Sequence, residues 1–131
     1  EKYTGVSFHY MDSGIDTGRI ILQKEITIKE EDTAYSLYHK LIGVFSSNFC
    51  EAFDLLMAGY NGMEQKGLSS YYSRKLPYEG KREIKDLNLE DAWRFVRAMY
   101  FPPYKGAVFI LKDGSKVEIN SIESLHHYMR V

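Results

Sequence analysis

The feature that most constrains this chain is the stretch GVSFHYMDSGIDTGRIILQ, from Gly5 to Gln23. Apolar and polar residues alternate through residues 4–11, which predicts a half-buried strand. A turn-rich cluster begins at Asp12, and a second, aliphatic strand is expected over residues 19–28. Asp16 therefore lies in a glycine-flanked loop between two strands. Rigid elements on both sides fix the direction of its carboxylate, as a catalytic or binding acid requires.

The composition is that of an ordinary globular chain. Its 131 residues suffice for one domain with a real core, and 44% are apolar. The formal net charge of −1 excludes a bulk electrostatic attraction to nucleic acid. We find no signal peptide and no apolar run of the roughly 18 residues that span a membrane, so we expect no membrane association and a cytoplasmic setting. Cys50 falls in an apolar helical pattern, which favours a buried structural thiol.

Helical patterns occupy two later stretches. Apolar residues at steps of three and four predict a long helix over residues 33–58, capped by Asp32 or Thr33 and ended at Gly59. A second helix is expected to begin at Asn88 and to end before Pro102 and Pro103.

Two other stretches complete the expected organisation. Residues 107–119 read as a hairpin with a turn at Asp113-Gly114, and a short helix or frayed end follows. Residues 61–87 show no periodicity and predict a linker or a substrate-facing loop.

The triplet Asp16-Thr17-Gly18 also occurs in aspartic proteases, where two carboxylates share a proton. Such chains are nearly all β, whereas two long helical patterns are present here. They also need a second glycine motif near the C-terminus, and the sequence has none.

The chain resembles formyltransferases that use 10-formyltetrahydrofolate. The stretch that opens this section is similar to the family pattern G-V-T-x-H-x-(M/V)-D-x-G-x-D-T-G-x-I-I. Three further segments follow in the family's order: DTAYSLYHKL (32–41), YYSRKLPYEGKREI (71–84) and VRAMYFPPYKGAVF (96–109). Together the four segments cover most of the chain.

This resemblance implies an α/β fold: the C-terminal part of a doubly wound, Rossmann-like sheet, followed by a small α+β extension. We expect residues 1–60 to belong to the catalytic domain, 61–87 to form a linker or substrate loop, and 88–131 to form a helix-hairpin subdomain. By the same resemblance Asp16 is the catalytic acid. Its family partners, an Asn and a His some thirty to forty residues upstream, lie in a part of the enzyme that this sequence does not include, so the chain alone is expected to be inactive.

The resemblance also implies the formyl donor and the residues beside it. The donor is 10-formyltetrahydrofolate, with His9, Asp12, Gly14 and Ile15 near its pterin, the loop contributing mainly backbone groups. His9 fits a hydrogen-bonded core histidine equally well. The alternative role for Asp16 is that of an acid that caps the turn.

A nucleotide-linked amino sugar is the expected acceptor. Tyr71 and Tyr72 would stack on it and Arg74 would bind its pyrophosphate, although a solvated loop explains them too. The family usually has an acid and an aromatic residue at Glu83-Ile84, so the acceptor contacts are less well defined. Methionyl-tRNA formyltransferase is the alternative enzyme. A non-catalytic domain that binds a nucleotide sugar or another subunit is the alternative from a different class.

Partners and metals complete the expectations. The N-terminal half of the same enzyme would cover one face of the long helix and the edge of the first strand, and without it we expect oligomers, including a homodimer. His126 and His127 are adjacent, so their side chains point apart, and we expect no metal site.

Overall fold

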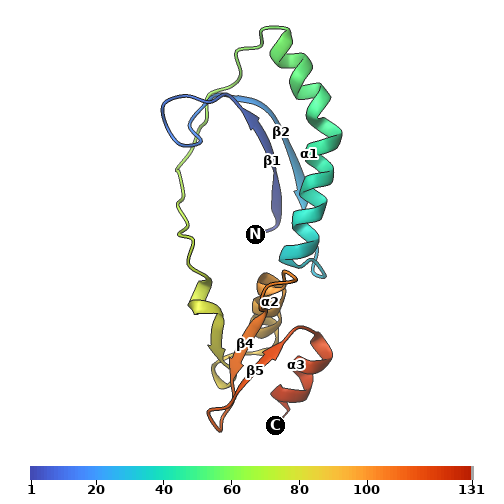
Figure 1. The fold of residues 1–131 in the computed structure, drawn as a ribbon, viewed down its shortest axis with the longest axis vertical. Helices are drawn as coiled ribbons and strands as arrows, with labels where there is room; N and C mark the ends of the chain where they lie inside the picture. Colours follow the sequence, from blue (N-terminus) through green and yellow to red (C-terminus); the bar gives the residue numbers. More distant parts are fainter. Residues whose placement is uncertain (131) are drawn as a thin grey trace. The chain divides into compact units, whose positions relative to one another are not determined.

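The computed structural model describes residues 1–130 (Figure 1). The elements run in the order β1 (Tyr3–His9), β2 (Ile20–Thr27), α1 (Ala34–Met57), η1 (Pro77–Gly80), β3 (Lys81–Glu83), η2 (Ile84–Asp86), α2 (Leu89–Met99), β4 (Ala107–Ile110), β5 (Lys116–Ile119) and α3 (Ile122–Met129).

The chain divides into two compact units. The first unit comprises Glu1–Glu30 and Tyr38–Tyr71, and the second comprises Glu31–Leu37 with the described residues from Tyr72 onward. Each has its own sheet, the antiparallel pair β1-β2 in the first and the order β3-β4-β5 in the second. Among residues 1–130, no helix is long and apolar enough to cross a membrane.

The β1-β2 hairpin confirms the two strands predicted at the N-terminus. Its strands are antiparallel, with Tyr3 opposite Thr27 and Phe8 opposite Leu22. The register shifts between Phe8 and His9. This irregularity lies where β1 ends and the loop of residues 10–19, here called the acidic loop, begins. It therefore affects the direction in which the His9 side chain leaves β1.

Helix α1 begins and ends as predicted. Thr33 and Ser36 cap it reciprocally, because each side-chain oxygen accepts a hydrogen bond from the other's backbone N–H. At the other end Gly59 adopts a positive φ of 76°. In Figure 1 the helix runs alongside the hairpin, and the Phe45 ring stacks on Phe8 with centroids 4.9 Å apart.

Much of the apolar face of α1 stays exposed, as expected. Ala52 is its one buried residue. The large side chains on or beside this face are 39–70% exposed: Tyr35, Tyr38, Ile42, Phe45, Phe49, Phe53, Leu56 and Met57. The prediction of a buried Cys50 was wrong, because its thiol is exposed on this sparsely covered helix.

The chain after α1 folds back onto the hairpin, although residues 61–87 carry no periodic pattern that would predict this pairing. Met63 and Ile20 exchange both backbone hydrogen bonds, at 2.7 and 2.8 Å. The Tyr10 hydroxyl donates to the Tyr60 carbonyl. Gly62 has φ 74°, and a Cβ there would lie 2.9 Å from the Ile20 carbonyl oxygen, so the close approach requires glycine.

The second unit holds the larger core. The predicted face of α2 is buried (Ala92, Phe95, Val96 and Met99) and packs with Phe109, Ile119 and Leu125. Asn88 caps α2 by accepting from the Asp91 N–H. The predicted hairpin is confirmed as β4 and β5, and β3 adds to β4 in parallel, a pairing that the sequence did not indicate.

Candidate functional site

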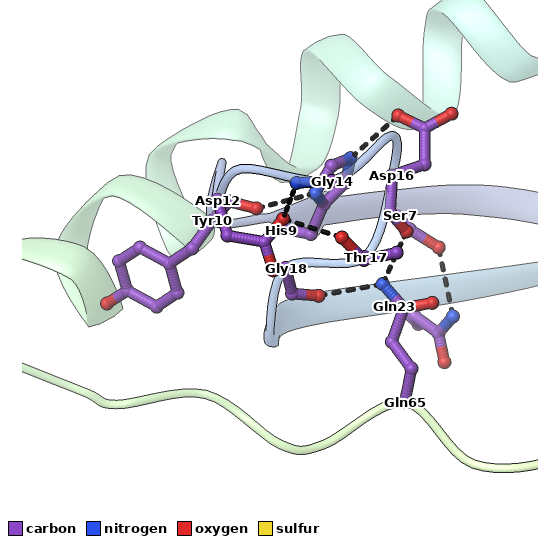
Figure 2. Close-up of polar contacts among 10 residues, drawn as sticks. All are labelled: Ser7, His9, Tyr10, Asp12, Gly14, Asp16, Thr17, Gly18, Gln23 and Gln65. Atoms are coloured by element: carbon purple, nitrogen blue, oxygen red, sulfur yellow. Dashed lines mark hydrogen bonds and ion pairs between the residues drawn. The ribbon is translucent and has the colours of Figure 1, made fainter.

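The loop between β1 and β2 is organised by Asp12. Its Oδ1 accepts hydrogen bonds from the Gly14 N–H at 2.9 Å and from the Thr17 hydroxyl at 2.6 Å (Figure 2). The Thr17 bond and then the Gly14 bond lower the pKa of Asp12 below its ordinary value of 3.8. Asp12 is therefore an ionised anchor that bends residues 12–17 into one fixed turn.

Asp16 lies at the tip of this turn. Its backbone has a φ of 53°, in the left-handed region that residues with a Cβ seldom occupy. Its side chain is 86% exposed, and its Oδ1 is 3.7 Å from Nε2 of His9, a side chain only 27% exposed. His9 Nδ1 donates to the Tyr10 carbonyl at 2.8 Å. The ring is thus held on one side by the backbone while its other nitrogen faces the acid.

The glycine of the triplet is required by contact rather than by φ. A Cβ on Gly18 would lie 1.6 Å from the Tyr10 carbonyl oxygen. Tyr10 N–H donates to the Arg19 carbonyl at 2.9 Å, which closes the neck of the loop. The two strands can only approach this closely because residue 18 has no side chain.

The segment after α1 holds the loop from the other side. Gln65 Nε2 donates to the carbonyls of Asp16 and Gly18, both at 2.7 Å (Figure 2). Arg19 Nε donates to the Asn61 carbonyl at 2.8 Å, and Arg19 Nη2 to the Gly62 carbonyl at 2.9 Å. The acid is thus supported by both the hairpin and the returning chain.

A cavity of about 470 Å³ lies beside this loop. It is lined by Tyr10, Asp12, Gly18, Arg19, Gly59 and Asn61. This lining combines a carboxylate, a guanidinium and a carboxamide, a set that can bind a flat ring with donors and acceptors on its edge. Asp16 is not among the lining residues, so its carboxylate and the cavity lie on different parts of the loop surface.

Most of the predicted donor-side residues meet in one place. His9, Asp12, Gly14 and Asp16 form the contacts just described, and the Ile15 side chain is 90% exposed beside them. The predicted acceptor residues lie on an exposed stretch where one compact unit ends and the other begins: Tyr71 in the first, Tyr72 and Arg74 in the second. Their contact with a substrate stays a prediction.

Metal binding has no support from geometry in the part of the chain that the structure describes. No group of three or more His, Cys, Asp or Glu side chains there could hold an ion. His126 and His127 lie on α3, where His127 packs against the Tyr128 ring.

Three site residues were missed from the sequence. Thr17, Arg19 and Gln65 all bind the loop or its neck. The bond from the Gly14 N–H to Asp12 follows a known turn rule, in which an aspartate accepts from the backbone two residues on, but no such rule predicts the Thr17 bond five residues on. Arg19 and Gln65 donate hydrogen bonds to backbone carbonyls on segments more than forty residues away, and no local sequence pattern predicts such contacts.

Residues 1–52 match the family model described as "Formyl transferase". The chain is 39% identical over 130 residues to a GDP-perosamine N-formyltransferase of Brucella melitensis, covering 99% of this chain and 49% of that protein. It is 35% identical over 126 residues to a methionyl-tRNA formyltransferase of Thermodesulfovibrio yellowstonii, covering 95% and 40%. The chain thus spans about half the length, or less, of these relatives.

Solved structures agree in fold. A sugar N-formyltransferase from a Shewanella species superposes with a TM-score of 0.73 at 27% identity, over 92% of this chain and 50% of that one. An N-formyltransferase from Helicobacter canadensis, solved with folinic acid and dTDP-3-aminofucose, gives a TM-score of 0.63 at 28% identity, over 80% and 40%. These likenesses confirm the predicted α/β formyltransferase fold class. With the matching family model and the relatives at 35–39% identity, they show that the chain belongs to the formyltransferase family.

Proposed function

We propose that this chain is part of an enzyme that moves a formyl group from 10-formyltetrahydrofolate to the amine of a nucleotide-linked amino sugar. The observation that carries the proposal is the fixed Asp16 loop, which lies in the segment that matches the formyl transferase family model. The sugar acceptor is supported by the relative at 39% identity, which is a GDP-perosamine N-formyltransferase.

The reaction needs a group that manages protons. The acceptor amine forms a bond to the formyl carbon, and a tetrahedral intermediate carries the developing oxyanion. The bond from the formyl carbon to the folate nitrogen then breaks. The amine loses one proton and the folate nitrogen gains one, so a positioned acid–base group lowers the barrier.

Asp16 is suited to that role by its position. Its backbone is held from both sides, so its carboxylate projects from a fixed point of the loop. As an ionised acid it would orient a histidine or a water molecule that takes the amine's proton. Its high exposure fits a group that another part of the enzyme must approach, because the chain spans about half of its relatives' length.

The residues around Asp16 would bind the donor. The cavity lined by Asp12 and the Gly18 backbone offers both donors and acceptors to a pterin ring. His9, Gly14 and Ile15 would form the adjoining wall. Tyr71, Tyr72 and Arg74 would contact the acceptor, the rings by stacking and the guanidinium through phosphate oxygens.

Formylation of methionyl-tRNA is the second candidate. It is favoured by the relative at 35% identity, which is a methionyl-tRNA formyltransferase. The net charge of −1 argues against it, because binding a polynucleotide depends on a surplus of cations. A steep fall of activity with salt, seen with tRNA but not with a nucleotide sugar, would favour this second candidate.

The decisive test is Asp16→Asn in the longest form of the protein that contains these residues. GDP-linked and dTDP-linked amino sugars and methionyl-tRNA would serve as acceptors with 10-formyltetrahydrofolate. We expect kcat to fall by roughly a hundredfold or more, because the amide cannot accept a proton or hold a cationic partner. Asp113→Asn is the control, since Asp113 is an exposed acid in the turn between β4 and β5, outside the loop that holds Asp16.

The outcomes separate the alternatives. Near-normal turnover of Asp16→Asn would overturn the catalytic assignment. Binding of a nucleotide sugar without any turnover in the unmodified protein would favour the non-catalytic binding domain instead.

A further inference from the structure

We propose that Gln65 is a positioning residue that sets the direction of the Asp16 carboxylate. The inference rests on the proposed function of Asp16 and adds a residue to it. Gln65 lies outside the loop, 49 positions along the chain from Asp16.

The contact uses the whole donor capacity of one side chain. Gln65 Nε2 carries two hydrogens, and it donates to two carbonyls, those of Asp16 and Gly18, at 2.7 Å each. These carbonyls flank Thr17, so the amide spans the second half of the acidic loop. A glutamate at this position would present acceptors to both carbonyls, and an asparagine would be one methylene shorter.

The residue held is the one in an uncommon conformation. Asp16 has a φ of 53°, and a residue with a Cβ stays in that region only when its surroundings hold it there. Its carbonyl and its side chain leave the same Cα, so fixing the carbonyl limits the directions that the carboxylate can take. Asp12 fixes the first half of the loop through Gly14 and Thr17, and Gln65 fixes the second half.

Gln65 reaches the loop because the returning chain is anchored next to it. Met63 pairs with Ile20 through both backbone groups, and Arg19 binds the carbonyls of Asn61 and Gly62. Those bonds already attach the segment to the hairpin. The Gln65 bonds are therefore not needed to hold the segment in place. They go to the loop rather than to a strand. Their distinct effect is therefore on the loop.

The experiment compares Gln65→Leu, Gln65→Glu and Gln65→Lys with Gln23→Leu. Leucine removes the donors at similar size, glutamate replaces them with acceptors, and lysine restores a donor that can reach both carbonyls. Gln23 is the control, because it donates to the Ser7 hydroxyl across the hairpin and not to the loop (Figure 2). Amide hydrogen exchange of residues 14–18 and of Tyr10 reports on the loop, and kcat and KM report on the reaction.

We expect faster exchange at the loop amides and a kcat that is lower by roughly tenfold in the Leu and Glu variants, with KM for the acceptor within about twofold. Lysine should recover most of kcat, and Gln23→Leu should match the unmodified protein. A merely structural role would instead lower folded population and leave kcat per folded molecule unchanged.

Comparing Gln65→Leu with Asp16→Asn separates a failure of the positioning role of Gln65 from a failure of the role proposed for Asp16. If Asp16→Asn abolishes turnover while Gln65→Leu leaves loop exchange and kcat unchanged, the positioning role is wrong and the proposed function stands. If Gln65→Leu loosens the loop but Asp16→Asn turns over normally, the catalytic role of Asp16 is wrong although formyl transfer stands, and Gln65 orders a loop without a catalytic acid, which also overturns the positioning role.

Discussion

His9 and Asp16 face each other across the mouth of the acidic loop, with Nε2 of the imidazole 3.7 Å from Oδ1 of the carboxylate. The Tyr10 carbonyl can only accept, so the hydrogen in the 2.8 Å contact with His9 is on Nδ1. A neutral His9 therefore turns the lone pair of Nε2 toward the acid. The contact is an ion pair only when the ring carries a second proton.

This geometry predicts different effects for two substitutions of His9. Asparagine places an amide where Nδ1 was and keeps the bond to Tyr10, whereas glutamine places a donor near the former Nε2. We expect His9→Asn to lower kcat about two- to fivefold, the range that a partly exposed ion pair supports, and His9→Gln to lower it less. Steady-state kinetics on both variants checks this, and a larger loss in His9→Gln would refute the assigned orientation.

Acid is expected to loosen the loop through Asp12. Its pKa is lowered in the folded protein, so the folded state holds the proton less tightly than the unfolded chain. The stabilisation by Asp12 is therefore present above its ordinary pKa of 3.8 and is lost as the pH falls from there through the lowered value. Exchange of the Gly14 amide, followed between pH 5 and pH 3, measures it.

Asp12→Asn is the control for that titration. The amide oxygen can still accept from Gly14 and Thr17, but it carries no charge and does not titrate. Its Gly14 exchange should be faster at neutral pH and should lack the acid-dependent step. An identical acid step in the variant would assign the effect to another group.

The core of the second unit depends on Phe109. This side chain is fully buried and meets the Phe95 ring edge-on, with centroids 5.7 Å apart. We expect Phe109→Ala to cost about 3–5 kcal/mol of unfolding free energy, a large part of the stability of a small domain. Urea denaturation followed by the Trp93 fluorescence measures it. Leu68→Ala should change almost nothing, because Leu68 is fully exposed.

The uncovered face of α1 is expected to cause self-association of the 131-residue chain. Phe49 and Phe53 stack with centroids 6.3 Å apart, and each remains about half exposed, at 50% and 47%. Phe53→Glu should weaken association by roughly thirtyfold, since burying one such ring is worth about 2 kcal/mol. Sedimentation velocity measures this, with Ser47→Glu on the same helix as the control. A clean monomer of the unmodified chain would contradict the expectation.

Local patterns were sufficient for the elements that carry their own signals. The caps at Thr33 and Asn88, the ends of α1 and the turn of the β4-β5 hairpin follow from residue types at fixed spacings. The family pattern around Asp16 added the role that we propose for the loop, because D-T-G alone also fits an unrelated protease chemistry. These features depend on neighbours within a few residues, which a sequence displays directly.

The remaining features depend on partners far away in the chain. Gln65 and Arg19 bond carbonyls whose positions only the folded hairpin defines, and β3 is three residues long with no alternation to reveal it. Cys50 was assigned to a core because its spacing is helical, yet spacing does not say whether anything covers that face. The predicted domain boundaries stay predictions. So do the acceptor contacts of Tyr71, Tyr72 and Arg74, because these depend on a partner that local spacing does not reveal.

The pairing of Ile20 with Met63 joins the two ends of the stretch that contains α1. A protease that nicked this helix would leave both products hydrogen-bonded through that bridge and through Arg19. We therefore expect a single cut within α1 to leave the two pieces of the first unit associated rather than free, because contacts made by the chain on both sides of the cut still hold them together.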